Sequence, residues 1–196
     1  GSERLEVIVV DNASSDDTAR LLSRIDGLVV ITNPTNLHFL RATNEGAKRA
    51  RGRYLCLLNS DTRVLPGTIE RAFQRLDGDR TLGAIGGILR LPDGSLQEAG
   101  SFIWRDGTCE GYGRGDDPLG ACYQHEREVD FCSGAFLMTP KDLWEELHGL
   151  SDDFAPAYYE EVDYCLRVWE SGRRVLFDPT LVVEHFEFAS AAHLHA

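Results

Sequence analysis

Several features that define other protein classes are missing from this sequence of 196 residues. No apolar run approaches the ~20 residues that a membrane-spanning helix needs, and the first residues lack the pattern of a secretory signal. The five cysteines are widely spaced without a CxxC pair, which argues against a zinc knuckle or a disulfide framework. We therefore expect free thiols and a cytoplasmic location, with association at the inner face of the membrane left open.

An excess of positive charge is also missing. The chain carries 20 Lys and Arg against 32 Asp and Glu, a formal net charge of −12. A nucleic-acid surface needs a basic field, so no nucleic-acid partner is expected. Anionic ligands stay open, because a bound divalent cation can invert the local field. With no internal repeat or low-complexity linker, we expect one domain over residues 3–188, between a cloning remnant at Gly1-Ser2 and a tail at 189–196.

In the first half of the chain, short apolar runs alternate with helical patterns. Strands are predicted at 5–10, 28–32 and 54–58, and helices at 18–25, 39–52 and 68–76. This alternation predicts an α/β fold with a mainly parallel central sheet and helices on both faces. Ligands of such sheets bind beyond the carboxyl ends of the strands. DNASS and NSDT follow the first and third strands, so Asp11 and Asp61 are candidate site residues.

The second half has a different pattern. Two strands joined by a turn at PDG are predicted over 82–103, and a mobile, glycine-rich loop over 105–128. A strand over 129–139 contains Gly134, where we expect another backbone or a ligand to come close. Helices at 140–149 and 160–172 and a strand at 174–178 complete the prediction.

The stretch YYEEVDYCLR (158–167) places three carboxylates, Glu160, Glu161 and Asp163, among aromatic residues. In a helix, Glu160 and Asp163 would share one face while Glu161 points about 100° away. Acids at a helix N-terminus are favoured by the macrodipole and need no catalytic role. Alternatively, the tyrosines and Pro156 wall the acids into a pocket, where a carboxylate with a raised pKa serves as a general base. This segment alone leaves both readings open.

Two further segments are candidates for a metal site. Asp61, on a sharp turn, suits Mg2+ or Mn2+, which take a few carboxylates together with substrate phosphates. The competing interpretation is a turn in which Asn59 and Asp61 cap their own backbone. His185 follows an apolar strand and would act as a metal ligand only with a carboxylate close in space.

Taken in order and spacing, these segments resemble a family 2 glycosyltransferase of the GT-A fold, and especially its bacterial rhamnosyltransferase-like members. The resemblance covers nearly the whole chain and is strongest in LEVIVVDNASSDDT, LLNSDT, LPDGSLQEAG, YYEEVDYCLR and LVVEH. The family's usual first strand and helix, roughly thirty residues, have no counterpart before the strand at 5–10.

The resemblance implies a role for each candidate residue on the metal and acceptor sides. NSD is similar to the family's DxD motif, with Asp61 as the metal ligand and Asn59 in place of the first acid, on the donor side. His185 is similar to a late histidine of the metal site. Glu-Glu stands where the family carries Glu-Asp, which implies Glu161 as the catalytic base. Glu160 and Asp163 would then lie on the acceptor side.

On the donor side, the resemblance implies that Asp11 contacts the nucleoside and that Asn36 and Asn44 lie near the donor pocket. His38 stands where the family usually has glycine. The implied activity is inverting, Mg2+- or Mn2+-dependent transfer from a nucleotide-diphosphate sugar to a hydroxyl of a glycan, polysaccharide or lipid-linked acceptor. Segment 105–128 would be a lid that excludes water. Peripheral membrane association and dimer formation are compatible with this reading.

Two alternatives remain. A sugar nucleotidyltransferase would share the sheet and the metal aspartate, but the basic, glycine-rich phosphate loop expected near its start is missing here. A non-catalytic carbohydrate- or partner-binding relic is favoured by Asn59 and by the lack of the usual first strand.

Overall fold

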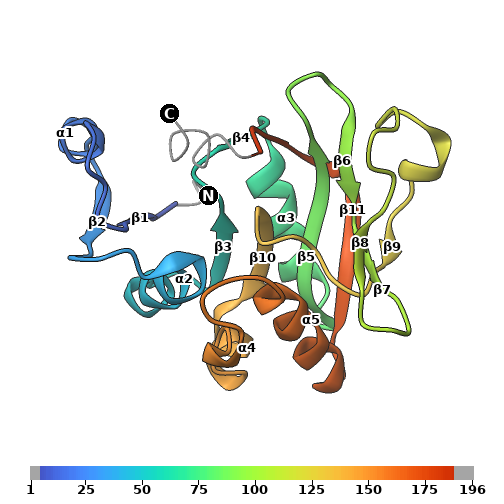
Figure 1. Cartoon of the computed structure of the whole chain (residues 1–196). Coiled ribbons are helices and arrows are strands. Elements are labelled where there is room, and N and C mark those ends of the chain that lie inside the picture. Colours follow the sequence, from blue (N-terminus) through green and yellow to red (C-terminus); the bar gives the residue numbers. More distant parts are fainter. Residues whose placement is uncertain (1–4, 188–196) are drawn as a thin grey trace.

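The computed structural model describes residues 5–187. The expected remnant at Gly1-Ser2 and tail at 189–196 therefore lie outside the described residues. Within the described part of the chain, seven strands form one sheet with the order β3-β10-β5-β11-β4, while β6 pairs with β5 and β9 with β11 (Figure 1). These strands are β3 (Tyr54–Leu58), β4 (Thr62–Val64), β5 (Leu82–Arg90), β6 (Leu96–Ala99), β9 (Arg127–Glu128), β10 (Phe136–Pro140) and β11 (Arg174–His185).

The sheet is mixed. β11 runs parallel to β5, whereas β10 is antiparallel to both β3 and β5, and β4 is antiparallel to β11. The predicted α/β class with helices on both faces is confirmed, but the central sheet is mixed where a mainly parallel one was predicted, since β5–β11 is its one parallel pairing among residues 5–187. A parallel strand needs a long crossover connection, usually a helix. No helix lies between β9 and β10, and β10 runs antiparallel to its neighbours.

Helices cover both faces of this sheet. α3 (Thr68–Gly78) packs on one face, and α4 (Lys141–Glu146) and α5 (Glu160–Glu170) pack on the other. Side chains of β5 alternate between the two layers: Ala84 and Ile88 face α5, whereas Ile85 and Leu89 face α3. The strand is therefore buried on both faces, which explains its continuous apolar sequence.

α5 forms because its sequence has one apolar stripe and a clear stop. Val162, Cys165 and Val168 recur every three residues, and their exposed fractions are 6%, 0% and 0%. Gly172, with a φ of +80°, ends the helix in the left-handed conformation that glycine adopts without strain. The buried stripe fixes which side of the first turn, and so which acids, face the protein interior.

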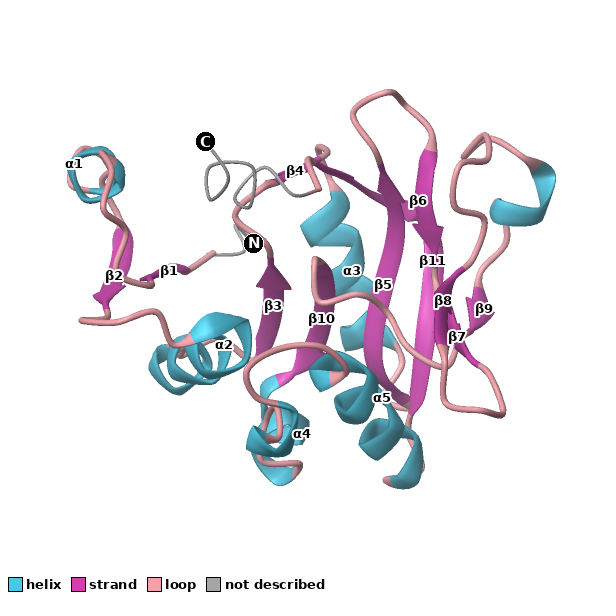
Figure 2. Cartoon of the chain, viewed as in Figure 1, coloured by secondary structure: helices cyan, strands magenta, loops and turns pink. Residues whose placement is uncertain are grey.

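The first two strands form a separate sheet. β1 (Val7–Asp11) and β2 (Leu28–Thr32) are parallel, and within residues 5–187 no strand pairing joins them to the larger sheet. Figure 2 shows the pair set apart from β3, with α1 (Thr18–Leu22) beyond it. The predicted parallel pairing of these two strands is confirmed, but the third predicted strand, β3, pairs with β10 instead.

α2 (His38–Arg49) is the element that holds β1 in place. A Cβ atom on Gly46 would lie only 3.2 Å from Val10 Cγ2, so the helix approaches the strand closely at this glycine. Just after the helix, the backbone N–H of Arg51 donates to Glu6 Oε2 at 2.8 Å. Helix packing thus takes the place of a neighbouring strand.

Segment 105–128 is not the free loop that its composition predicts. It contains β8 (Cys109–Gly111), which pairs with β7 (Ser101–Ile103), and a short 3-10 helix at Ala121–Tyr123. The N–H groups of Leu96 and Ala99 donate to carbonyls of this segment at Asp116 and Tyr112. Strands this short, set among glycines, leave no periodic signal in the sequence.

Residues 129–139 were also predicted as one strand, but only Phe136–Pro140 is paired as β10. The backbone N–H of Ser133 instead donates to the side chain of Glu98.

All five cysteines are unpaired, as predicted. Within residues 5–187 there is no helix with the length and apolar character needed to cross a membrane.

The contact between β5 and β11 allows a sharp test of packing. A Cβ atom on Gly87 would lie 2.2 Å from the carbonyl oxygen of Leu181, so we expect Gly87→Ala to lower the free energy of unfolding by about 3 kcal/mol. Urea denaturation followed by circular dichroism measures this. Gly78→Ala is the control, because nothing lies within 4 Å of its added Cβ. Equal midpoints for Gly87→Ala and the wild type would contradict the packing described.

Candidate functional site

β4 and β11 bring Asp61 and His185 together. The strands pair with His185 opposite Thr62, and the N–H of Phe186 donates to the carbonyl of Asp61 at 2.7 Å. As a result, His185 Nε2 lies 3.2 Å from Asp61 Oδ1, and His185 is only 7% exposed. The structure thus supplies the nearby carboxylate that His185 needs to be a metal ligand.

Asn59 lies beside the same pair. Its side-chain nitrogen is 3.5 Å from His185 Nε2. The turn itself is closed by the Thr62 hydroxyl, which donates to the Asn59 carbonyl at 2.7 Å. Asn59 and Asp61 therefore direct their side chains toward His185, and the interpretation in which they cap their own turn is not needed.

The donor atoms at this point fit a hard divalent cation. An imidazole nitrogen and a carboxylate oxygen 3.2 Å apart match two adjacent ligands of an octahedral ion, whose edge is about 3 Å for bonds of about 2.1 Å. Residues 5–187 contain no group of three or more His, Cys, Asp and Glu side chains that could hold a metal. These side chains would hold only part of a coordination shell, and Mg2+ or Mn2+ usually completes such a shell with water and phosphate oxygens.

Gln97 contacts the other side of His185. No role was predicted for this residue. Its Oε1 is 2.8 Å from His185 Nδ1, and Gln97 is 8% exposed. Its neighbour Glu98 was also overlooked. Glu98 Oε1 accepts from the N–H of Ser133 at 3.3 Å. No residue type or spacing distinguishes these two positions from other polar positions of a hairpin.

Glu98 and Glu161 form a pair of partly buried acids. Desolvation and the charge of Glu161 raise the pKa of Glu98 to about 7, although the hydrogen bond from Ser133 acts in the opposite direction. Burial also raises the pKa of Glu161, and a hydrogen bond from the Gly134 backbone opposes this. A Cβ atom on Gly134 would lie 3.0 Å from the Phe39 ring and 3.9 Å from Glu161 Cβ, so side chains come close to this glycine where another backbone or a ligand was predicted.

Glu160, the first residue of α5, is 5% exposed, and its Oε2 has no hydrogen-bond partner among the described residues. Burial raises its pKa. The predicted wall of tyrosines is wrong, because Tyr158 and Tyr159 are 81% and 45% exposed. The acids are buried instead because α5 packs its first turn against the body of the protein.

Asp163 lies in a structural ion pair. Its Oδ2 accepts from Arg167 Nη2 at 2.6 Å, and the same guanidinium donates to the carbonyls of Leu147 and Gly149. These contacts tie α5 to the end of α4. The acceptor-side role of Asp163 stays a prediction, and no contact in the structure adds support to it.

The donor-side candidates lie at the end of β1, in the loop after β2 and in α2. Asp11 is 5% exposed, and its Oδ1 accepts from the N–H of Ser14 at 2.9 Å. Asn36 Oδ1 accepts from the N–H of His38 at 2.8 Å. Asn44 uses both ends of its amide on the backbone of Leu150, at 2.8 and 3.0 Å, so it holds α2 to the turn after α4.

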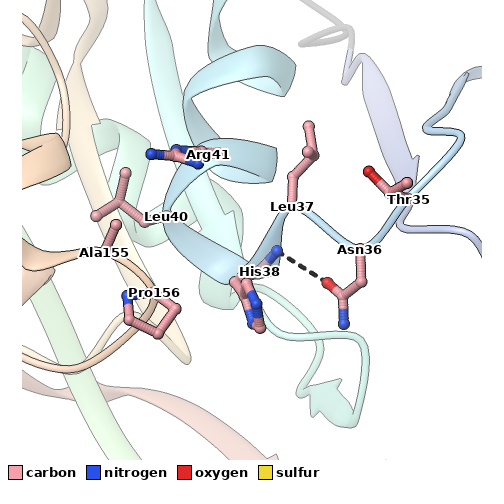
Figure 3. A pocket seen from close by; sticks show the side chains of 8 residues that line it. All are labelled: Thr35, Asn36, Leu37, His38, Leu40, Arg41, Ala155 and Pro156. Atoms are coloured by element: carbon pink, nitrogen blue, oxygen red, sulfur yellow. Dashed lines mark hydrogen bonds between the residues drawn. The ribbon is translucent and has the colours of Figure 1, made fainter.

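A cavity of about 380 Å³ opens next to the loop that carries Asn36 (Figure 3). Asn36 and His38 line one side and Pro156, in the segment before α5, lines the other. His38 has a φ of +60°, a conformation that favours glycine. That accounts for the glycine usual at this position in the family that the sequence resembles.

The structure thus joins four of the nine predicted residues in two groups. Asn59, Asp61 and His185 form the first, and Glu161 lies in the second together with Glu98. Adjacent residues of β6, Gln97 and Glu98, link the two groups. Within residues 5–187, the side-chain hydrogen bonds of Asp11, Asn12, Asn33 and Asn36 do not reach either group.

Comparison with known proteins assigns the family. The model of the family described as glycosyl transferase family 2 matches residues 1–145. This chain belongs to glycosyl transferase family 2. A Sinorhizobium fredii protein, uncharacterized protein y4gI, is 26% identical over 96% of this chain and 22% of its own length. The O-antigen biosynthesis protein RfbC of Myxococcus xanthus is 26% identical over 94% of this chain and 15% of its own length.

Solved structures agree with the GT-A fold. GalNAc-T7, crystallised with UDP, GalNAc and Mn2+, aligns with a TM-score of 0.75 at 17% identity over 92% of this chain and 37% of that one. The mannosyltransferase PcManGT from Pyrobaculum calidifontis, in complex with GDP-Man and Mn2+, aligns with a TM-score of 0.65 at 18% identity. The alignment covers 92% of this chain and 47% of that one. At these sequence identities the structural similarity shows a shared fold and nothing more. The family 2 chain described here spans less than half of these relatives.

The raised pKa of Glu98 predicts how stability depends on pH. The native state holds this proton more tightly than the unfolded chain, whose value is 4.5, so ionisation at higher pH lowers the free energy of unfolding. Glu98→Gln keeps the acceptor for Ser133 without the charge. We expect the free energy of unfolding of the variant to exceed that of the wild type by up to about 3 kcal/mol at about pH 8 and by much less at about pH 5.

Urea unfolding at the two pH values measures this gap. Glu146→Gln, at an exposed position of α4, is the matched control. Its free energy of unfolding should differ from that of the wild type by the same amount at both pH values. If Glu98→Gln were less stable than the wild type at the higher pH, the carboxylate would be stabilising and the description of its environment would be wrong.

Proposed function

We propose that the protein containing this chain is an inverting, metal-dependent glycosyltransferase that uses a nucleotide-diphosphate sugar. The observation that carries the proposal is the pair formed by Asp61 and His185, with the buried Glu161 linked to it through β6. Supporting it, the structures of GalNAc-T7 and PcManGT that share the fold contain UDP or GDP-Man together with Mn2+.

Asp61 and His185 would hold Mg2+ or Mn2+, with Asn59 beside them. When bound, the cation neutralises the diphosphate leaving group. Asn59 carries no charge, so these residues supply one negative charge fewer than the two acids of a DxD motif. The diphosphate of the donor itself supplies oxygen ligands and negative charge, which fits the incomplete set of protein ligands.

Glu161 would act as the general base. Burial raises its pKa, which makes the carboxylate a better proton acceptor. It removes the proton of an acceptor hydroxyl as that oxygen forms a bond to the anomeric carbon. The bond from the anomeric carbon to the diphosphate breaks on the opposite face, which inverts the configuration.

Asp11, at the end of β1, would contact the nucleoside, and Asn36, in the loop after β2, would contact the donor. The cavity lies between the loop of Asn36 and Pro156, in the segment before α5. A glycan, polysaccharide or lipid-linked acceptor is proposed, and the relative named as an O-antigen biosynthesis protein supports the polysaccharide class. Segment 105–128 would serve as the lid, anchored by the ion pair between Arg114 and Glu187.

A non-catalytic binding module is the second candidate. The observations that favour it are the uncharged Asn59 and the separation, within residues 5–187, of the donor-side strands from the larger sheet. The enzyme requires both metal-dependent nucleotide binding and Glu161, whereas a module that binds a carbohydrate or a partner protein requires neither.

Metal-dependent nucleotide binding tests the metal site. We expect UDP, GDP or dTDP to bind at least about tenfold more tightly with Mn2+ than without it, a difference of about 1.4 kcal/mol. Asp61→Asn should remove this difference because it deletes the charged ligand. Isothermal titration calorimetry measures both, with Asp26→Asn at an exposed position as the control. Equal Mn2+ dependence in Asp61→Asn and the wild type would refute the assigned ligand.

Substitution of Glu161 separates the enzyme from the binding module. In the full-length protein, Glu161→Gln should lower kcat for sugar transfer by about 10²–10⁴-fold while nucleotide binding is kept, because only the proton acceptor is lost. Release of the nucleoside diphosphate from the preferred donor measures the rate, and Glu146→Gln is the matched control. Transfer by Glu161→Gln at the wild-type rate would show that another group is the base.

A further inference from the structure

Gln97 lies against the side of the His185 ring that faces away from Asp61. Its Oε1 is 2.8 Å from Nδ1, and both residues are more than nine-tenths buried. In this arrangement the amide oxygen of Gln97 accepts a hydrogen bond from Nδ1–H. A ring that donates from Nδ1 can offer its electron pair to a cation from Nε2, the nitrogen 3.2 Å from Asp61 Oδ1.

An irregularity of β6 directs Gln97 to this position. Leu89 pairs with Glu98 and Arg90 with Leu96, which leaves Gln97 without a partner in β5. A β-bulge of this kind re-aims a side chain and is frequent beside active sites. The N–H groups of Leu96 and Ala99 are bonded on the other edge of the strand, at 2.8 and 2.9 Å, so the bulge is held from both sides.

We propose that Gln97 is a positioning residue, which holds His185 with its proton on Nδ1 and leaves Nε2 free to bind a divalent cation. This rests on the proposed function, in which Asp61 and His185 hold Mg2+ or Mn2+. Hydrogen bonds to the far nitrogen of a ligating histidine fix its tautomer and orientation, and their loss typically costs about 10–100-fold in metal affinity.

An ordinary core contact would have a different consequence. If Gln97 only satisfied a buried polar atom, its replacement would lower stability and leave metal affinity and the tautomer unchanged. The test therefore needs two variants of Gln97. Gln97→Leu removes the acceptor with little change in size, and Gln97→Glu retains an acceptor at the same reach. Gln74→Leu, at an exposed position of α3, is the control for loss of an amide.

Mn2+ affinity is the first readout, measured by electron paramagnetic resonance of free Mn2+ with UDP or GDP present. We expect Gln97→Leu to bind Mn2+ about 10–100-fold more weakly than the wild type, with Gln97→Glu and Gln74→Leu within about threefold of it. Mn2+ binding by the wild type and equally by Gln97→Leu would overturn the role of Gln97 and leave the proposed function intact.

The ring tautomer is the second readout, and it needs no metal. Nitrogen-15 NMR at about pH 8, with chelator present and His185→Gln for assignment, should show the proton on Nδ1 in the wild type and in Gln97→Glu. In Gln97→Leu the Nε2–H form should increase. A wild-type ring without a proton on Nδ1 would overturn the inference. Absence of Mn2+ binding in the wild type, with Nδ1 protonated, would instead overturn the proposed metal site and with it the purpose of the contact.

Discussion

The register of β11 is the constraint on which the candidate site depends. This strand pairs in parallel with β5 along most of its length and in antiparallel fashion with β4 at its end. The last pairs place His185 opposite Thr62 and let Phe186 bond to the carbonyl of Asp61. A slip of one residue would turn His185 to the other face of the sheet. The backbone ladder therefore sets the contact between two side chains that are 124 residues apart.

β6 couples this contact to the buried acids. Its bulge sends Gln97 to His185, while the next residue, Glu98, receives the N–H of Ser133. One short strand thus supplies a neutral amide to the metal side and a carboxyl group to the side of Glu161. The acids stay buried at a cost in stability, since burial disfavours their charged forms. Destabilised groups of this kind are common at functional sites, where chemistry and stability compete.

The donor side is built differently. β1 and β2 pair with one another, and the close approach of α2 at Gly46 holds them, without a strand between β1 and β3 in the described part of the chain. In the proposed reaction the nucleoside would contact Asp11 while the diphosphate lies at Asp61 and His185. A single ligand would then bridge the two sheets. Donor binding and the arrangement of α2 are therefore expected to be linked.

Local sequence determined much of this protein. Apolar runs and caps located most strands and helices, and Asp61, His185 and Glu161 were nominated by residue type, position or resemblance. Tertiary structure alone decided the rest. Tyr158 and Tyr159 were expected to wall the acids but are exposed, because the packing of α5 and not its neighbours in sequence buries the first turn. Gln97 and Glu98 acquired their surroundings from β11 and from the strand-like segment at Ser133, far away in the chain. A sequence specifies which side chains can bind, ionise or accept a proton, but long-range strand register and burial select the ones that meet.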